Sequence, residues 1–379
     1  MGSVSSKQIR KGTPLEECLS VDEEGVSTLE SDGDSKVSLF EADARNVSDR
    51  VQPNSVDLIV TSPPYWRKRD YGFENQIGQE STAEKYVDEV MKAMSDWKEV
   101  LRPTGSIFFN IGDTYHKRSL AGIPGMIEKR IRKKEWYIRN RFVWIKRGGM
   151  PDPAKNRLAP RHEFILFVAP NYDYYFDLYG YSRRFGNGSN PGDVLEVELE
   201  RDTSEHLAPY PDEIVERAVT MACPHAVCSK CGQPRERIVE RTAQLDPSRP
   251  QARRAMEIAK EAGLTCEHIQ AIQATGISDA GKAKEIQNGT GRNSEEVKEL
   301  ASEAKEVLGG YFREFTFAKR KTTGWTSCDC DAETVPGTVL DPFMGTGTTL
   351  ETALRMGRSA IGVDLKKPEG IQHNITPGK

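Results

Sequence analysis

A turn at residues 57–72, DLIVTSPPYWRKRDYG, combines a hydroxyl, a rigid backbone and an aromatic ring at the end of an apolar run, as a site for chemistry would need. An apolar run ending at Val60 is followed by the Ser62 hydroxyl, two prolines and the ring of Tyr65. The prolines fix φ and lack N–H donors, so nearby acceptors stay in place. The Ser62 hydroxyl and the Pro63 carbonyl can then accept hydrogen bonds from a ligand and hold it in position.

A second turn, VLDPFMGTGTT at residues 339–349, places two glycines between an apolar strand and a helix. Such a turn lets the backbone approach a ligand closely and directs helix N–H groups towards it. Asp341 precedes the glycines, and Asp364 follows Gly347 by seventeen residues, where a carboxylate can accept hydrogen bonds from ribose hydroxyls. Position 350 is Leu, so the complete G-x-G-x-x-G fingerprint is absent. The two acidic residues nevertheless favour an adenosine-type cofactor.

Four of the seven cysteines form two closely spaced pairs, Cys228 with Cys231 and Cys328 with Cys330. Four thiolates on two tight turns suit a structural, tetrahedral zinc ion. The N-terminus has no apolar export signal, so the thiols are expected to be reduced and metal binding is favoured over disulfides. The alternatives are unliganded buried cysteines, or sites at Cys223 with His225 and at Cys266 with His268.

The overall charge gives no nucleic-acid signature, because the net charge is −4 and the pI is about 6.0. Residues 129–147 are locally basic, with nine Lys or Arg, one Glu and four interleaved aromatic residues. This pattern is typical of a nucleic-acid surface, although a solvated helix followed by a half-buried strand would also produce it. The chain has no run of 18 apolar residues, which argues against a membrane span and predicts a cytoplasmic location.

Strands and helices are expected to alternate in a way that predicts a doubly wound, mostly parallel α/β sheet. Apolar runs without polar alternation are typical of strands buried on both faces. Such strands are expected at 37–43, 56–60, 106–112, 138–146, 162–169 and 360–364. Helices are expected at 82–101, 125–134, 209–222 and 348–357.

TSPPYW and DPFMGTGTT together resemble motifs of the β-group DNA amino-methyltransferases, which use S-adenosylmethionine, and the resemblance is to their cytosine-N4 type. The catalytic motif precedes the cofactor motif, as in the circularly permuted order of that group. EADARN resembles the segment whose Asp, here Asp43, lies near the adenine. HLAPYPDEIV resembles the segment that closes over the methionine end, and residues 149–177 resemble the region after the sixth strand. The resemblance covers residues 37–222 and 335–366.

The resemblance implies a Rossmann-like methyltransferase fold with a zinc-binding helical insertion, and it assigns roles to individual residues. The implied catalytic residues are Ser62, Pro63, Pro64 and Tyr65. The implied cofactor-binding residues are Asp43, His206, Pro211, Asp341, Phe343, Gly345, Thr346, Gly347, Thr348 and Asp364. The expected DNA contacts are Trp66, Arg67, Lys68, Arg139, Arg141 and Arg157.

The implied reaction is direct methyl transfer to the exocyclic N4 of cytosine in a flipped-out base that stacks on Tyr65. Methylation of cytosine C5 would need the nucleophilic Cys of a Pro-Cys dipeptide, and the chain contains only the reverse order, Cys223-Pro224. Ser62 in place of Asp favours cytosine over adenine N6. Adenine or RNA as substrate stays open, as does a zinc-dependent DNA-binding protein whose methylase core is inactive.

The expected organisation is a polar leader at 1–36, a catalytic domain at 37–222 and 331–379, and a zinc knuckle with a helical insertion at 223–330. The space that β-group enzymes use for target recognition holds only residues 177–205 here. We therefore expect the insertion to read double-stranded DNA, and its loose resemblance to archaeal enzymes suggests a short palindrome such as CTAG. A helical cap that only stabilises the zinc site is the alternative. A cognate restriction endonuclease and the oligomeric state both stay open.

Overall fold

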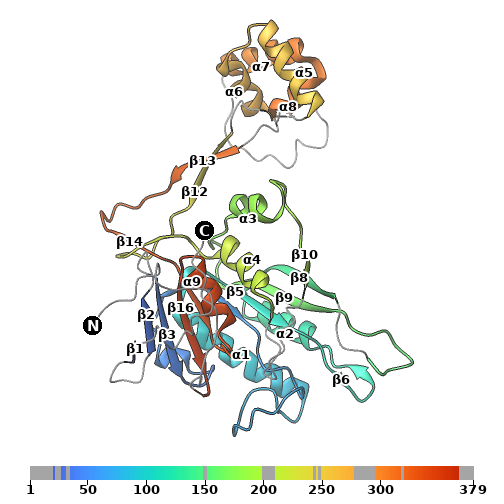
Figure 1. Ribbon diagram of the computed structural model, residues 1–379, viewed down its shortest axis with the longest axis vertical. Coiled ribbons are helices and arrows are strands. Elements are labelled where there is room, and N and C mark those ends of the chain that lie inside the picture. Colours follow the sequence, from blue (N-terminus) through green and yellow to red (C-terminus); the bar gives the residue numbers. More distant parts are fainter. Residues whose placement is uncertain are drawn as a thin grey trace. The chain divides into compact units, whose positions relative to one another are not determined.

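The computed structural model describes residues 20–21, 27–30, 35–147, 152–198, 210–241, 245, 249–276, 295–316 and 320–366 (Figure 1). The chain divides into two compact units. The first unit comprises residues 1–236 and 327–379, and the second comprises residues 237–326. No described helix is both long enough and apolar enough to span a membrane.

A ten-stranded mixed sheet forms the centre of the first unit. Its spatial order is β1 (Ser20–Val21), β2 (Ser27–Glu30), β3 (Lys36–Glu41), β16 (Ser359–Asp364), β15 (Thr338–Asp341), β4 (Val56–Thr61), β5 (Leu101–Ile111), β9 (His162–Ala169), β8 (Tyr137–Arg147) and β10 (Val194–Glu198). The five strands from β3 to β5 are parallel, whereas β9 is antiparallel to both neighbours. This sheet confirms the expected mostly parallel α/β architecture.

Strands from the two ends of the chain are interleaved at the centre of the sheet. β15 and β16 lie between β3 and β4, with Leu340 paired to Ile59. Parallel neighbours end at the same side of a sheet, so the turns after β15 and β4 are adjacent. We call the side where β3, β16, β15, β4 and β5 end the carboxyl edge, and the side where they begin the opposite edge.

Helices cover both faces of this sheet because successive strand residues point to opposite sides. Ile59 packs with α1 (Ala83–Val100) and α2 (Ile123–Lys133). Leu58 and Val60 pack with α4 (Asp212–Ala222) and α9 (Thr348–Arg355). The Thr82 side chain caps α1 by accepting a hydrogen bond from the Lys85 backbone N–H. Helix α3 (Leu178–Phe185) packs against α4 in the same unit.

Smaller elements complete the first unit. They are the 3₁₀ helix η3 (Val47–Asp49), the hairpin of β6 (Tyr115–His116) with β7 (Ser119–Leu120), and the pair of β11 (Val227–Cys228) with β14 (Thr334–Val335).

The second unit is a two-stranded ribbon with a helical cluster. Strands β12 (Arg237–Arg241) and β13 (Arg320–Trp325) pair antiparallel. The helical elements are α5 (Pro250–Glu261), α6 (Cys266–Thr275), α7 (Glu295–Leu308), η5 (Gly309–Tyr311) and α8 (Phe312–Thr316). Small buried residues such as Ala252, Ala255 and Ala304 pack the helices together. The segment that follows α6, residues 277–294 of the expected helical insertion, lies outside the described residues.

Candidate active site

The carboxyl edge gathers most of the residues that the sequence singles out. Along the strand order, the cofactor half consists of Asp43, Asp364 and the turn 341–348. The acceptor half consists of the turn 62–65 with Asn110, Glu163 and Lys146. The two halves meet where β15 and β4 pair.

Glycine shapes the turn of the cofactor half. Gly345 and Gly347 have φ values of +50° and +90°, a region that side chains with a Cβ rarely adopt. Gly347 is the residue that precedes α9, so the first N–H groups of this helix face the carboxyl edge. A Cβ at Gly362 would lie 2.7 Å from Leu350 Cδ1 and would also overlap Met344, which shows how closely the turn packs on β16.

Asp364 and Asp43 form the acidic side of the cofactor half. Asp364 Oδ2 accepts a hydrogen bond from the Gly345 N–H at 3.0 Å, and burial raises the pKa of this carboxyl. The Ala42 N–H donates to the Asp364 carbonyl, which brings the segment containing Asp43 beside β16. Burial by itself would raise the pKa of Asp43, but the hydrogen bonds and charge of Arg45 lower it below its usual value. Both carboxylates are therefore held near the glycine turn.

Asp341, an expected cofactor-binding residue, lies beneath the turn and is bonded to protein groups. Its side chain is 2% exposed and accepts hydrogen bonds from Thr61 Oγ1 at 2.7 Å and Thr349 Oγ1 at 2.6 Å. The Phe343 N–H and the Tyr210 hydroxyl donate to the same carboxylate at 3.0 and 3.2 Å. Four donors occupy both oxygens, so Asp341 ties β4 to the turn.

The other expected cofactor-binding residues differ in how deeply they are buried. Phe343 is half-buried, with its ring edge against Trp97 at a centroid distance of 6.0 Å. Thr346 is half-buried and Thr348 is buried at the start of α9. Pro211 is buried and precedes the first residue of α4. His206 lies outside the described residues.

A chain of polar contacts organises the acceptor half. Ser62 Oγ lies 3.5 Å from the Tyr65 hydroxyl, and that hydroxyl donates to Glu163 Oε2 at 2.7 Å. Asn110 Nδ2 lies 3.4 Å from Ser62 Oγ and 3.0 Å from both the Tyr65 and Glu163 oxygens. The other oxygen of Glu163 forms an ion pair with Lys146. The half-buried Tyr65 is therefore fixed by its hydroxyl.

Two features hold the Tyr65 side chain in this chain of contacts. A Cβ at Gly112 would lie 2.9 Å from the Tyr65 ring, so only glycine leaves room for the ring in this position. Burial, followed by the negative charge of Glu163, raises the pKa of Tyr65 well above its usual value. The phenol therefore remains protonated and continues to donate to Glu163.

Sequence reasoning missed Asn110, Glu163 and Lys146, which come from three different strands. The available signals were a polar residue inside the apolar run FFNIG and an acidic residue at the start of HEFILF. Neither signal predicts which strands become neighbours.

The expected DNA contacts fall into two groups. Arg67 and Lys68 are exposed in the loop after the turn 62–65. Arg157 stacks over the Tyr115 ring at 3.9 Å and forms an ion pair with Asp152. The Ala154 N–H, and then Arg157, lower the pKa of Asp152 below its usual value. This group is close to the carboxyl edge.

The second group is buried, paired with protein groups or away from the carboxyl edge. Trp66 is 3% exposed and donates from Nε1 to the Glu80 carbonyl, so its ring is part of the core and is not available to stack on DNA. Arg141 forms an ion pair with the buried Glu128 at 2.7 Å. Arg139 lies near the start of β8, towards the opposite edge, where it packs over the Tyr174 ring.

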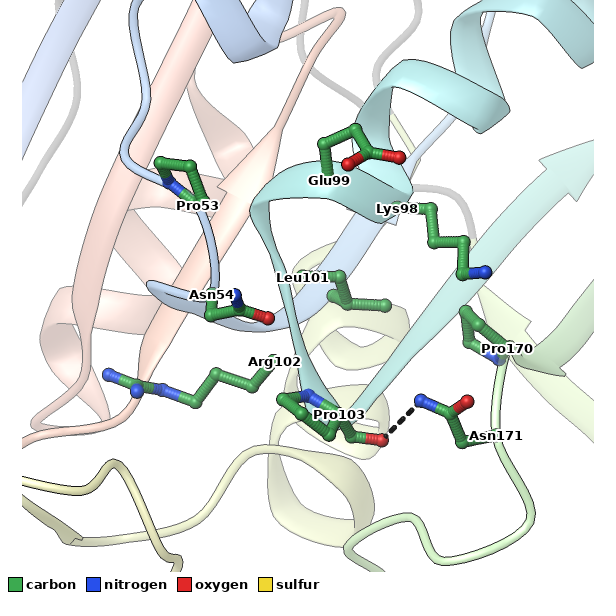
Figure 2. Close-up of a pocket in the computed structure, with 9 residues that line it drawn as sticks. All are labelled: Pro53, Asn54, Lys98, Glu99, Leu101, Arg102, Pro103, Pro170 and Asn171. Carbon is green, nitrogen blue, oxygen red and sulfur yellow. Dashed lines mark hydrogen bonds between the residues drawn. The ribbon is translucent and has the colours of Figure 1, made fainter.

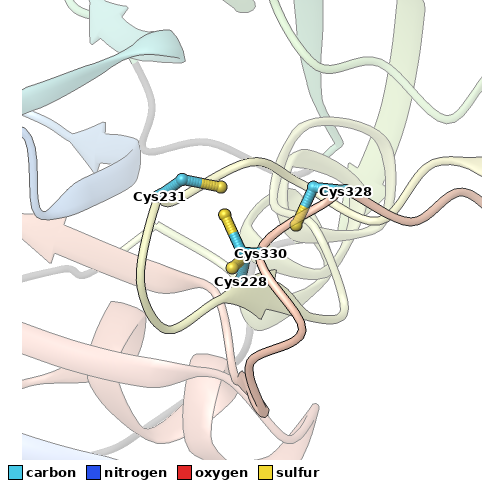
Figure 3. Close-up of side chains that lie close together, drawn as sticks. All are labelled: Cys228, Cys231, Cys328 and Cys330. Carbon is cyan, nitrogen blue, oxygen red and sulfur yellow. The ribbon is translucent and has the colours of Figure 1, made fainter.

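The four paired cysteines converge in the first unit (Figure 3). Their Sγ atoms all lie within 4.8 Å of one another. The backbone N–H of Cys231 is the main cause that lowers the pKa of Cys228 to about 6, which favours a thiolate. Cys223 is buried apart from this cluster and its pKa is raised by that burial. Cys266 is the first residue of α6 in the second unit.

The cysteine cluster is anchored at the opposite edge. Arg102 forms an ion pair with the buried Asp57 at 3.2 Å, and the Thr338 N–H donates to the same carboxylate. Gly232, with φ of +70°, packs directly on the Arg102 guanidinium, where a Cβ would overlap it. A shallow pocket lies nearby, around the start of β5 (Figure 2). The Asn171 side chain donates to the Pro103 carbonyl at its rim. This pocket is separate from the candidate active site.

Comparisons with known proteins show a sequence match to one family of methylases. The sequence profile of a DNA methylase family (N6/N4 type) matches residues 56–226 and 332–369, which is more than half of the chain. The type II methyltransferase M.Cfr9I of Citrobacter freundii is 31% identical over 208 residues, covering 47% of this chain and 69% of that protein. M.XycI of Xanthomonas campestris pv. cyanopsidis is 30% identical with the same coverage. The structure of PvuII DNA methyltransferase (cytosine-N4-specific) covers 88% of this chain and 83% of its own, at 15% identity and a TM-score of 0.45.

Proposed function

This chain belongs to the N6/N4 DNA methylase family, and we propose from that premise that it is a site-specific cytosine-N4 methyltransferase of double-stranded DNA. The observation that carries the proposal is the adjacency of two turns. Pairing of β15 with β4 places the glycine turn 341–348 beside the turn 62–65, so a cofactor and an amino group would meet at one edge.

S-adenosylmethionine fits the cofactor half as the methyl donor. The open glycine turn and the start of α9 leave room for close approach to the backbone, and Asp364 and Asp43 supply acceptors for ribose and adenine groups. The bound cofactor would supply an electrophilic methyl group on a sulfonium. The residues of this chain bind and orient it; Asp341 contributes by fixing the turn.

The acceptor half would prepare the target amino group. An exocyclic amino nitrogen is a weak nucleophile because its lone pair is delocalised into the ring. Ser62 Oγ and the Pro63 carbonyl accept hydrogen bonds from this group and align it, with the base taken out of the duplex. Ser62 and Pro63 would hold the nitrogen towards the methyl group that bound S-adenosylmethionine would supply, and the proton lost by the amino group would pass to water.

The choice of cytosine rests on Ser62, and adenine N6 is the second candidate. Labelled S-adenosylmethionine and unmethylated DNA, followed by nucleoside digestion and mass spectrometry, distinguish the two. N4-methylcytosine is the expected product. N6-methyladenine would keep the reaction and overturn the base assignment, and absence of product on any DNA would contradict the proposed activity.

DNA would be held at the carboxyl edge by Arg67, Lys68 and Arg157. These residues carry positive charge beside the turn 62–65, where a flipped base must enter. Phosphate contacts of this kind position a duplex without reading its sequence. In a restriction–modification system such a methyltransferase would protect DNA from a cognate endonuclease, as the similarity to type II methyltransferases suggests.

The cysteine cluster fits a structural zinc ion, because four thiolates within bonding reach of one point match the tetrahedral Cys₄ set. Metal analysis of the purified chain should give one zinc per chain. Cys228→Ser should lose the metal and lower the melting temperature, whereas Cys223→Ser, outside the cluster, should keep the metal. An unchanged metal content in the Cys228 variant would contradict the site.

We assign target recognition to the insertion at 232–327, with a purely stabilising cap as the alternative. Deleting 243–310 leaves the cysteine cluster in place. The variant that lacks residues 243–310 should still bind S-adenosylmethionine but should lose site-specific methylation. Retained sequence specificity with reduced thermal stability would instead support the stabilising role.

A further inference from the structure

In the hydrogen bond between Tyr65 and Glu163, only Tyr65 can be the donor. An ionised carboxylate accepts hydrogen bonds and cannot donate them. The Tyr65 hydroxyl therefore gives its proton to Glu163 Oε2 at 2.7 Å. Its oxygen can then only accept, from the Ser62 hydroxyl at 3.5 Å and from Asn110 Nδ2 at 3.0 Å. The carboxylate thus sets the direction of each hydrogen along the chain.

This direction determines what Ser62 offers to a substrate. Donation from Ser62 Oγ to the Tyr65 oxygen, over 3.5 Å, directs the Ser62 hydrogen towards Tyr65. A lone pair of Ser62 Oγ is then free to accept from that group. Without the carboxylate, the Tyr65 hydroxyl could turn its hydrogen towards Ser62. The Ser62 hydrogen would then face the N–H of the substrate, and two donors would oppose each other.

Lys146 and Asn110 fix the carboxylate that sets this direction. Lys146 pairs with Oε1 of Glu163, while Tyr65 and Asn110 both donate to Oε2. Each oxygen therefore has its own donors. Asn110 is 4% exposed and its amide bridges Ser62, Tyr65 and Glu163. Glu163 itself is largely shielded, with 14% of its side chain exposed.

We propose that Glu163 is a positioning residue for methyl transfer, acting through Tyr65 to hold Ser62 as a hydrogen-bond acceptor for the target amino group. The inference rests on the proposed function, because it concerns the same site. Glu163 contacts neither the glycine turn nor Asp364 within the described residues, so its role concerns the transfer step and not cofactor binding.

The first test is Glu163→Gln in the full-length chain. Gln keeps the shape of the side chain, but its amide group no longer enforces one hydrogen direction. We expect kcat for methyl transfer to unmethylated DNA to fall about 10- to 100-fold, less than loss of a direct transition-state contact. The Kd for S-adenosylmethionine, measured by calorimetry, should stay within about twofold, since an unaffected cofactor half contributes the binding energy. Glu128→Gln is the matched control, because within the described residues Glu128 pairs with Arg141 and Arg132 and has no hydrogen bond to Ser62, Tyr65 or Glu163; it should leave kcat unchanged.

A double-mutant cycle with Tyr65→Phe tests whether Glu163 acts through Tyr65. Tyr65→Phe removes the hydroxyl that connects Glu163 to Ser62. The double variant should therefore be no slower than Tyr65→Phe alone, because coupled residues do not have additive effects. A structural role for Glu163 would predict additive losses and would overturn the proposal.

The activity of the wild type distinguishes a failure of the proposed methyltransferase function from a failure of the proposed role of Glu163. A wild type that methylates no DNA contradicts the proposed function and this inference together. An active wild type whose Glu163→Gln variant keeps full kcat contradicts the inference alone.

Discussion

The two halves of the carboxyl edge are built in different ways. The cofactor half is one continuous turn, in which glycines set the backbone and Asp341 fixes it from beneath. The acceptor half depends on side chains from β4, β5, β9 and β8 that meet only in the folded sheet. Each half contains a shielded carboxylate. Asp341 is saturated by protein donors, whereas Glu163 directs hydroxyls towards the site.

This difference predicts that cofactor affinity and kcat depend on different halves of the carboxyl edge. A change in the cofactor half should alter affinity for S-adenosylmethionine and stability, because the backbone of the turn is itself the binding surface. A change in the acceptor half should alter kcat with little effect on cofactor affinity. Variants that affect both quantities equally would show that the two halves act as one unit.

The largest expected effect is that of Ser62→Ala. It removes the acceptor nearest to the target amino group, and kcat should fall about 100- to 1,000-fold. Cofactor affinity, measured by calorimetry, should be unchanged because Ser62 belongs to the acceptor half. A large loss of affinity in this variant would break the distinction between the halves.

Gly362→Val should have the opposite profile. The added side chain would overlap Met344 and lie against Leu350, so the glycine turn must shift. Overpacking of this kind costs about 1–3 kcal/mol of unfolding free energy, which urea denaturation would measure. We expect weaker S-adenosylmethionine binding, with kcat at saturating cofactor changed less than threefold. A variant with normal affinity would show that the turn tolerates movement.

The positions of the buried strands along the chain and the cofactor turn could be predicted from sequence, because their signals are local. Apolar runs mark buried strands, and Gly345 and Gly347 mark a turn with positive φ. The contact between Glu163 and Tyr65 could not be predicted, because it depends on β9 inserting antiparallel beside β5 with Phe164 opposite Ile111. Burial of Trp66 likewise depends on how its loop folds back to Glu80.

Removing one hydroxyl from each half tests the difference between the cofactor half and the acceptor half, with smaller expected effects than Ser62→Ala or Gly362→Val. Thr349 donates to Asp341 at 2.6 Å and Tyr65 donates to Glu163 at 2.7 Å. Thr349→Val should cost about 2 kcal/mol of stability, since a hydrogen bond to a charged group is lost, and should weaken cofactor binding. Tyr65→Phe should lower kcat and leave cofactor affinity unchanged. An identical profile in both variants would contradict the separation.

The smallest expected effect concerns DNA at the acceptor half, where Lys68 is exposed beside the turn 62–65. Each phosphate contact contributes about 0.9 to the slope of log K against log salt concentration. Lys68→Ala should reduce that slope by about this amount, because one phosphate contact and its released counterion are lost. Arg139→Ala removes a similar charge near the opposite edge and should leave the slope unchanged. Binding measured by fluorescence anisotropy across a salt series checks both variants. A smaller slope for Arg139→Ala and an unchanged slope for Lys68→Ala would mean that DNA contacts the opposite edge. That result would contradict DNA binding at the carboxyl edge.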